Sequence, residues 1–337
     1  MSDFDIPDHL AFIKYKTASE ILSHSKFEEA REVYIARTAR VYATDVFPTR
    51  MSVDAGRVLI FGAIICLHAR HDPSDRETWP TLKLLKTVLV PFGLNSPRLV
   101  DDVVGRLVQT GYLELPQIAA DRRLRSLQPT EKLLAWDREW IAAYHAPLDV
   151  LYPDPGYAGP RLRDEAFQAV QRRAAIAIFP ISARILSKNP EMRFFLTMAS
   201  GNDIMLALFG MGAGQPDSRI RSSSFAVIGQ RFGLSRSHVR NVVRAAEERG
   251  FAARTGPRGQ YVQLTPKWRA AFDRFIAETL SSSDLTYRMA LRSLSDRTWQ
   301  SNRSASPAGL DLAEDARNEN RIALQGSAEG REVLAVG

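Results

Sequence analysis

The chain contains an internal repeat, which restricts its fold to two copies of one structural unit. The tripeptide Phe-Gly-Leu at residues 92–94 recurs at residues 232–234. After each tripeptide, segments 96–111 and 235–250 align without a gap and place valines at the same three positions. Such a repeat has to be found first, because overlooking it leads to the wrong fold. Further matches follow in the same order, at residues 127–132 and 262–267 and at residues 136–138 and 272–274.

The first two helices of the second copy are predicted from helix-capping and helix-breaking residues. Asn202 precedes the apolar stretch 203–211 and is a good residue for the start of a helix. Glycines between residues 210 and 214, and Pro216, are expected to end that helix in a loop. Ser223 or Ser224 then caps a second helix, which runs through Phe232.

The rest of the second copy is one longer helix, a hairpin and a final helix. Ser235 caps the longer helix, which runs to Arg249, and its apolar residues follow the 3,4 spacing of one buried face. Gly250 is placed as the residue just after its end. Two short strands are expected around the turn at residues 256–259, and Thr265-Pro266 begins a last helix through residue 280.

The second copy satisfies the packing requirements of a helix-turn-helix. Two short helices that cross at a fixed angle need a small residue at their contact and a glycine in the turn, here Gly229 and Gly233. The apolar residues expected between the helices are Ile228, Phe232, Leu234, Val239 and Val242. With the hairpin and the last helix, this segment resembles the winged helix-turn-helix transcription regulators, especially the MarR-like branch. The resemblance covers about residues 202–276, and more loosely residues 53–144.

The resemblance implies a mainly α-helical fold with small β-hairpin wings (α+β) and two tandem winged helix-turn-helix domains. The expected domains are an N-terminal helical segment (1–50), a degenerate winged helix (51–146), a linker and helix (147–200), a DNA-binding winged helix (201–294) and a mostly disordered tail (295–337). An amphipathic helix near residues 26–44 could pack on the first copy or on a second subunit. The linker is inferred from four prolines and two glycines in residues 147–160.

In winged-helix proteins of this kind, the N-terminal half of the third helix enters the major groove of DNA. The outward residues of helix 235–249 are Arg236, Ser237, His238, Arg240, Asn241 and Arg244. Arginine pairs bidentately with guanine and asparagine with adenine, so Arg236, Arg240 and Asn241 are expected at base edges. Ser237 and Arg244 are assigned to phosphates, and His238 is a base contact or an ordinary surface histidine. The hairpin adds Arg254, and Arg258 at its tip, as groove or backbone contacts.

Positive charge is concentrated in the second copy. Residues 219–274 contain twelve basic and three acidic residues, a net charge of +9, whereas the whole chain carries +7. A basic charge that coincides with a helix-turn-helix is the electrostatic pattern of DNA binding.

The first copy differs in composition. Leu89 replaces the small contact residue, and Pro91 is expected to kink or end the second helix. Asp101 and Asp102 lie on the equivalent third helix, where phosphate would repel them, and residues 92–140 have no net charge. This copy is therefore expected to bind a partner or mediate dimerisation, although its hairpin arginines 122, 123 and 125 could still touch DNA.

Several other classes of protein are disfavoured. The longest apolar run, residues 58–67, is half the length of a membrane-spanning helix, and the N-terminus lacks the apolar core of a signal peptide. One cysteine, Cys66, allows no intrachain disulfide, and a metal site made of Cys66, His68, His71 and Asp72 is disfavoured relative to a buried thiol beside helix-end histidines. No catalytic motif is present, so no enzyme activity, cofactor or metal is expected.

The sequence therefore predicts a cytoplasmic, nucleoid-associated transcription regulator that binds double-stranded DNA through the second copy. A homodimer on a partly palindromic site is expected, and the sequence names no effector. Two alternatives remain open. A plasmid-type replication initiator would pair one DNA-binding and one dimerising winged helix, and an interaction scaffold would not need the arginine-rich third helix.

Overall fold

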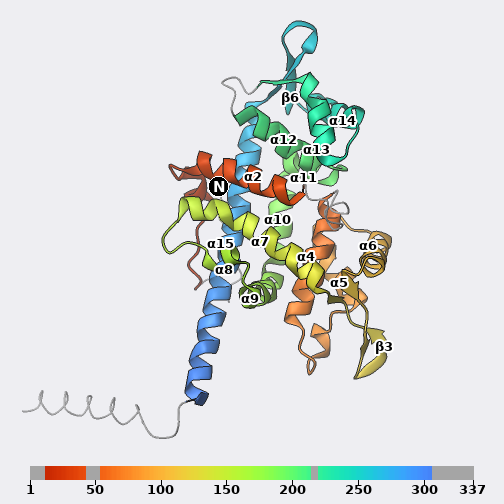
Figure 1. The fold of residues 1–337 in the computed structure, drawn as a ribbon, viewed down its shortest axis with the longest axis vertical. Coiled ribbons are helices and arrows are strands. Elements are labelled where there is room, and N and C mark those ends of the chain that lie inside the picture. The colour runs from red at the N-terminus through yellow and green to blue at the C-terminus, as the bar shows by residue number, and fades with distance from the viewer. Residues whose placement is uncertain (1–11, 43–53, 214–218, 306–337) are drawn as a thin grey trace, which may run out of the picture. The chain divides into compact units, whose positions relative to one another are not determined.

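The computed structural model describes residues 12–42, 54–213 and 219–305, which are mainly helical with small antiparallel sheets (Figure 1). The α-helices are α1 (Ala18–Ser23), α2 (Phe27–Tyr42), α4 (Ala55–Arg70), α5 (Leu82–Leu89), α6 (Pro97–Gln109), α7 (Glu131–Leu151), α8 (Ala158–Leu162), α9 (Glu165–Ala175), α10 (Phe179–Lys188), α11 (Pro190–Thr197), α12 (Gly201–Ala213), α13 (Phe225–Phe232), α14 (Arg236–Glu248) and α15 (Pro266–Ala305). The strands are β1 (Leu113–Glu114), β2 (Gln117–Ile118), β3 (Asp121–Arg125), β4 (Gln128–Pro129), β5 (Arg219–Arg221), β6 (Ala252–Thr255) and β7 (Tyr261–Leu264).

Residues Met1–Leu294 form one compact unit and Ser295–Gly337 a second. Within the first unit, we call α4 to α7 the first copy, α12 to α15 the second copy, and α8 to α11 the connector. Both copies show the expected succession of helices followed by a hairpin and a further helix.

The repeat seen in the sequence is also a repeat of local structure at the start of the third helix. The Ser96 hydroxyl accepts a hydrogen bond from the Leu99 amide at 3.2 Å, and the Ser235 hydroxyl accepts one from the His238 amide at 3.1 Å. Each serine satisfies one of the amides that a helix leaves unpaired at its N-terminus. The prediction of both serine caps is confirmed.

The end of the third helix is also the same in both copies. Gly111 and Gly250 adopt left-handed backbone conformations, with φ of 73° and 70°. The Thr130 hydroxyl donates to the Gly111 carbonyl and the Thr265 hydroxyl to the Gly250 carbonyl, each at 2.9 Å. These bonds tie the second residue after each third helix to the start of the following helix. The same threonine-to-glycine hydrogen bond is thus present in both copies.

In the second copy, α13 and α14 approach closely at a glycine. A Cβ atom at Gly229 would lie 2.5 Å from the carbonyl oxygen of Leu234, so no other residue fits without a shift of the backbone. Gly233 ends α13 with φ of 67°, a conformation that glycine adopts at no steric cost. Strands β5, β7 and β6 form an antiparallel sheet in that order beside this helix pair. The predicted roles of Gly229 and Gly233 are confirmed.

The first copy has a looser counterpart of this helix pair. Helix α5 ends at Leu89, and a 3₁₀ turn, Val90–Phe92, contains Pro91, as the sequence predicted. Gly93 then adopts φ of 62°, as Gly233 does in the second copy. The hairpin consists of β1 paired with β4 and β2 paired with β3.

Three predicted helix boundaries are wrong. Helix α12 begins at Gly201 and continues to Ala213, so Asn202 lies inside its first turn and the helix extends two residues beyond its predicted end at residue 211. A Cβ at Gly210 would lie 3.3 Å from Ile35, so this glycine allows α2 to approach closely. Burial against α2 therefore outweighs the weak helix propensity of glycine.

The other two boundaries concern α7 and α15. Helix α7 runs through Pro147 to Leu151, where burial of the proline and of Leu148 holds the helix together across the missing hydrogen bond. Helix α15 starts at Pro266 as predicted but extends far beyond residue 280. Residues 295–305 of the expected disordered tail are therefore helical, and residues 306–337 lie outside the described part of the chain.

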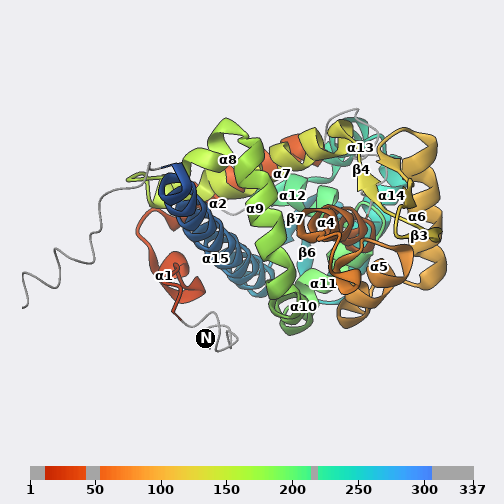
Figure 2. The same ribbon diagram turned by 90° about the horizontal axis from the view of Figure 1, so that it is seen from below.

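The two copies share a core through α2. Ala30, Tyr34 and Ile35 are buried in the same apolar cluster as Ile141 of α7 and Phe209 of α12. Of the two predicted positions for this amphipathic helix, the structure shows packing on the first copy within the same chain, and it adds packing on the second copy. In the connector, α9 packs against α4, and α10 lies beside α15 (Figure 2).

A buried polar network crosses the centre of this core. The Nδ1 atom of His145 lies 2.8 Å from the Ile141 carbonyl oxygen, and Nε2 lies 3.3 Å from the Gln171 amide nitrogen. Gln171 donates in turn to the hydroxyl of Thr286 on α15. This arrangement suits a neutral imidazole that donates from Nδ1 and accepts at Nε2. Burial lowers the pKa of His145 to about 4, below its ordinary 6.5.

Replacing Gly229 by alanine is expected to destabilise the protein by about 1–3 kcal/mol, because the new methyl group would overlap the Leu234 carbonyl. Urea unfolding followed by circular dichroism measures this. Gly105→Ala in α6 is the matched control, because a Cβ there meets no atom within 4 Å. The control is expected to stabilise the helix by about 0.5–1 kcal/mol. Equal effects of the two substitutions would contradict the close approach.

The stability of the protein is expected to depend on His145 between pH 6.5 and 4. In that range the unfolded state binds a proton that the folded state excludes, so this contribution is complete above pH 6.5 and is lost as the pH falls. At about 1.36 kcal/mol per pKa unit, the loss is at most about 3 kcal/mol. The free energies of unfolding of His145→Gln and of the natural protein, measured at pH 7.5 and pH 4.5, isolate the contribution of His145, because all other titratable groups are the same in both proteins. The same change in the free energy of unfolding with pH in both proteins would exclude this contribution.

Candidate nucleic-acid interface

Helix α14 presents one buried and one exposed face. Val239, Val242, Val243 and Ala246 are buried against the rest of the second copy. Arg236, Ser237, Arg240, Asn241 and Arg244 are exposed on the opposite side. The 3,4 spacing of the valines thus places the predicted DNA contacts in solvent, at the N-terminal end of the helix that the Ser235 cap begins.

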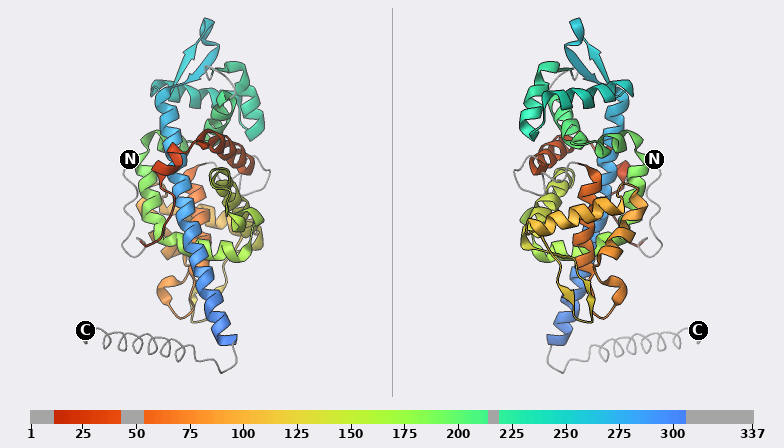
Figure 3. Two further views of the ribbon diagram at one scale, coloured as in Figure 1. Left: turned by 90° about the vertical axis from the view of Figure 1, so that its left-hand side faces the viewer. Right: turned by 90° about the vertical axis from the view of Figure 1, so that its right-hand side faces the viewer.

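The hairpin lies beside α14 and adds two of the predicted residues (Figure 3). Arg258 is exposed in the turn Pro257–Gly259 and adopts φ of 56°, between the positive-φ glycines Gly256 and Gly259. Gly256 and Gly259 let the backbone reverse direction tightly, so the guanidinium of Arg258 is carried at the tip of the hairpin. The structure thus brings together residues that lie about twenty positions apart in the sequence.

Three arginines of this surface make no ion pair within the described residues. These are Arg236 and Arg240 on α14 and Arg258 on the hairpin. A long exposed cation without an internal partner can turn toward an external anion without breaking an existing contact. We call Arg236, Arg240, Asn241 and Arg258 the basic face.

Two further predicted residues have internal partners. Arg254 on β6 forms an ion pair with Glu247 of α14, with Nε 2.9 Å from Oε1. This pair ties the hairpin to the helix, so Arg254 holds the hairpin in place rather than projecting as a free contact. Arg244 lies 4.0 Å from Glu248, one turn along an exposed helix face, where such a pair is worth little and is easily exchanged.

His238 differs from the other predicted residues. It is half-buried, and its Nε2 atom lies 2.9 Å from the carbonyl oxygen of Ala199, just before α12. The imidazole therefore joins the start of α14 to the start of the second copy. Of the two interpretations offered by the sequence, the hydrogen-bonding surface histidine fits this contact better than a residue that reads a base.

Part of the positive charge of residues 219–274 is matched by an acidic group elsewhere in the structure, since Arg274 lies 3.5 Å from Glu191 of the connector. Other arginines of the segment cover aromatic rings, as Arg249 does at 4.0 Å from the Phe194 ring centre. The basic face is therefore the part of this charge that remains directed outward.

The corresponding surface of the first copy is occupied by internal ion pairs. Asp101, which aligns with Arg240, lies 2.6 Å from Lys86 of α5. On the hairpin, Asp121 pairs with both Arg76 and Arg123 at 3.1–3.2 Å. Arg125 donates to the Leu115 carbonyl. Acidic residues on α6 and internally bound arginines on its hairpin distinguish this copy from the second.

A pocket that no sequence pattern predicted lies away from this face. It is lined by residues of α2, α4, α7, α9, α10, α11, α12 and α15, among them Trp140, Tyr144 and Thr279. The lining extends from Tyr34 to Thr286, so no local pattern in the sequence could have predicted it. Trp136, Trp268 and Phe272 are buried, as expected for core residues, and Trp136 and Trp140 also line the pocket.

The alternative metal site is not formed by the described residues, where no group of three His, Cys, Asp or Glu side chains is arranged to hold a metal. Cys66 is fully buried, which raises the pKa of its thiol to about 12. No single helix in the described ranges has the length and apolarity to cross a membrane. Helices α11 and α12 reach that length only as a pair, bent by 116°. No family model, no curated protein and no solved structure matches the chain.

Proposed function

We propose that this protein binds specific DNA sequences and regulates transcription, with α14 as the helix that enters the major groove. The observation that carries the proposal is the basic face. Arg236, Arg240 and Asn241 project from the N-terminal half of a helix whose other side is buried, and they are free to reach outward. Arginine and asparagine are the side chains that best recognise guanine and adenine edges.

The proposed fold is a tandem of winged helix-turn-helix domains. In the second copy, the order α12, β5, α13, α14, β6, β7 and α15 and the sheet order β5-β7-β6 support a winged helix. The close contact at Gly229 supports the helix-turn-helix, because it fixes the angle between α13 and α14. The equivalent serine caps and threonine bonds support a second domain of the same kind in the first copy.

The roles of the surrounding residues follow from their positions. Ser237 and Arg244 flank the base-reading residues on α14 and are assigned to the phosphates on either side of the groove. Arg258 at the tip of the hairpin reaches the neighbouring backbone or minor groove. Arg254 acts through Glu247 by holding the hairpin against α14. A homodimer that binds two half-sites is part of the proposal, since most regulators of this kind read a site with two-fold symmetry.

Replication initiation is the second candidate, and the difference between the two copies favours it. The surface around Asp101 has no net positive charge and Asp101 is paired with Lys86, so the first copy is better suited to a protein partner than to DNA. A tandem winged-helix initiator is expected to use one domain to bind DNA and the other to form a dimer. Both functions require the basic face, but they differ in where the protein binds the genome.

Arg240→Ala is expected to weaken binding to the specific DNA site by about 1–3 kcal/mol, because it removes a base-edge contact. Gel-shift titration at fixed salt measures this. Arg98→Ala is the matched control, because Arg98 is an exposed arginine on the equivalent helix α6 and the substitution removes the same charge. The control is expected to change the affinity less than twofold. Equal losses in the two variants would mean that only net charge matters.

The affinity should also fall steeply with salt, because each arginine bound to a phosphate releases condensed counterions. Arg258→Ala is expected to reduce the slope of the logarithm of the binding constant against the logarithm of the salt concentration by about one. It is also expected to weaken binding to all DNA sequences by the same factor. Absence of binding to any DNA, or binding that is insensitive to salt, would overturn the proposed function.

Mapping of the bound DNA across the genome separates the two candidates. Peaks at several promoters are expected for a transcription regulator. One cluster of repeated sites, together with loss of replication of a plasmid that carries it, would instead identify an initiator.

A further inference from the structure

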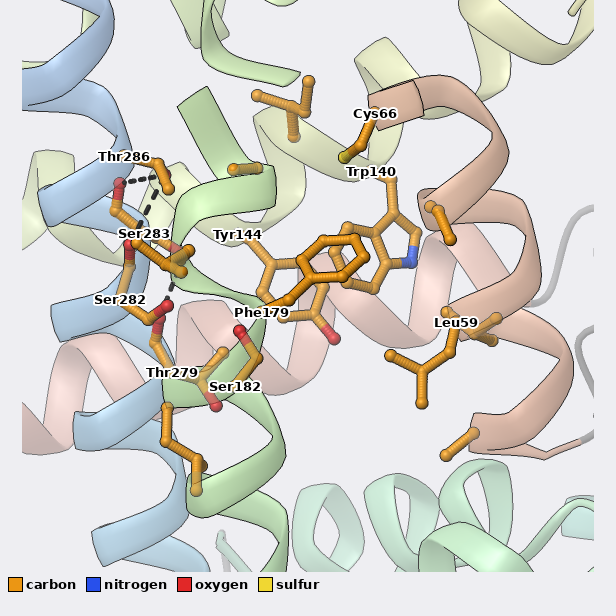
Figure 4. Close-up of a pocket in the computed structure, with 18 of the residues that line it drawn as sticks. Leu59, Cys66, Trp140, Tyr144, Phe179, Ser182, Thr279, Ser282, Ser283 and Thr286 are labelled. Atoms are coloured by element: carbon orange, nitrogen blue, oxygen red, sulfur yellow. Dashed lines mark hydrogen bonds between the residues drawn. The ribbon is translucent and has the colours of Figure 1, made fainter. Parts of the chain in front are cut away.

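A pocket of about 300 Å³ lies between the two copies, inside the unit formed by residues 1–294. Most of its walls come from α4 and α7 of the first copy, α9 and α10 of the connector and α15 of the second copy (Figure 4), and α2, α11 and α12 add one residue each. The pocket is therefore placed where the two copies and the connector meet, and it does not include the basic face.

Part of the pocket wall is aromatic and flat. The Trp140 and Tyr144 rings are stacked, with centroids 3.9 Å apart and planes inclined by 20°. Phe179 and Leu59 line the pocket with them (Figure 4). Flat apolar walls of this kind favour a flat apolar ligand, because aromatic rings stack with an offset at such distances.

A second part of the wall carries hydroxyl groups. Ser182 projects from α10, and Thr279 and Ser282 project from α15 (Figure 4). Within the described residues these three hydroxyls make no hydrogen bond, whereas the neighbouring Ser283 donates to the Thr279 carbonyl. Hydroxyls on a pocket wall can donate to or accept from a polar group of a ligand.

Three buried polar atoms on lining residues also have no partner in the described part of the chain. These are Nε1 of Trp136, Nε1 of Trp140 and Oε1 of Gln171, and Gln171 is only 3% exposed. Buried polar atoms are nearly always hydrogen-bonded, because leaving one unsatisfied is costly. Two donors and one acceptor without partners beside a pocket therefore point to a bound molecule.

The charged groups of the pocket are already satisfied. Asp137 pairs with Arg172, whose Nε lies 2.9 Å from the carboxylate, and Asp54 pairs with Arg57. His145 is held neutral by burial, with its pKa lowered to about 4. A charged ligand would thus be buried without a counterion, which is strongly unfavourable.

We propose that this pocket binds a neutral, flat and mainly apolar small molecule that carries one hydrogen-bonding group. The volume fits a ligand of about twelve non-hydrogen atoms, since a cavity of roughly 150 Å³ accommodates benzene. The ligand stacks on Trp140 and Tyr144 and directs its polar group to the hydroxyls of Ser182, Thr279 and Ser282. Because the ligand contacts both copies, its binding changes the packing of α15 against the first copy, and so changes the affinity of the protein for DNA. This regulatory part rests on the proposed function.

Isothermal titration calorimetry on the full chain tests the site with 1-naphthol, which is neutral, flat and carries one hydroxyl. We expect a dissociation constant below about 1 mM. Naphthalene-1-carboxylate, of similar shape but charged, is expected to bind at least tenfold more weakly. No binding of 1-naphthol, or equal binding of the charged compound, would overturn the proposal.

Gly62→Leu is expected to weaken 1-naphthol binding more than tenfold by filling the pocket. Gly62 lies on the pocket wall in α4, and a Cβ there meets no atom within 4 Å, so the fold is preserved. Gly105→Leu, at a helical glycine outside the pocket with the same open surroundings, is the control and is expected to bind normally. Thermal melting confirms that both variants are folded. Unchanged binding by Gly62→Leu would place the ligand elsewhere and overturn the assignment.

The paired substitution Ser182→Ala and Thr279→Val tests the polar part of the wall without changing its shape greatly. It is expected to weaken binding of 1-naphthol at least threefold and to leave 1-methylnaphthalene unaffected. Equal losses for both compounds would contradict a role of the hydroxyls.

A gel shift with the specific DNA site, with and without saturating 1-naphthol, tests regulation. A change in DNA affinity of at least threefold, absent in Gly62→Leu, is expected. Binding by calorimetry without any change in DNA affinity would overturn the regulatory part alone. If the protein binds no DNA, the proposed function fails, and calorimetry still decides the ligand site.

Discussion

The ring of Tyr34 is the contact on which the arrangement of the two copies depends. It lies 5.5 Å from Tyr144 of α7 and 6.4 Å from Phe272 of α15, in an edge-to-face arrangement with each. Tyr34 belongs to α2, which precedes both copies in the sequence, so a helix that is part of neither repeat joins them. The resulting core is continuous, and removal of α2 would expose apolar surface on both copies.

This shared core explains why two copies with the same frame can have different surfaces. The frame consists of serine caps, left-handed glycines and threonine hydroxyls that bond backbone atoms, and none of these lies on the exposed faces of α6 and α14. Exposed positions are then free to vary. Arg240 in one copy and Asp101 in the other occupy equivalent sites and carry opposite charges, and each is compatible with the same local fold.

Features that depend on a few neighbouring residues could be predicted from the sequence. The serine caps, the turn at Gly233 and the buried valines of α14 are of this kind, because backbone hydrogen bonding and helix periodicity decide them locally. The exposed residues of α14 were predictable for the same reason. Once the valines are buried, the spacing leaves only one side for the arginines.

Features decided by distant contacts could not be predicted. Gly210 lies close to Ile35 of α2, and the imidazole of His238 contacts the carbonyl of Ala199, thirty-nine positions before it. The sequence predicted Arg254 as a DNA contact. Its ion pair with Glu247 forms only when the hairpin folds against α14, so no local sequence pattern reveals it. The pocket is the extreme case, since its lining residues come from eight α-helices and share no sequence pattern.

Helix α15 runs without a break from Pro266, at the base of the hairpin, past Thr279 and Thr286 at the pocket. With a rise of 1.5 Å per residue, the twenty residues between Pro266 and Thr286 span about 30 Å. A rigid rod of that length acts as a lever. A tilt of about 5° at one end displaces the other by roughly 2.6 Å, close to the length of a hydrogen bond. A small adjustment at the pocket is thereby enough to displace the hairpin that carries Arg258.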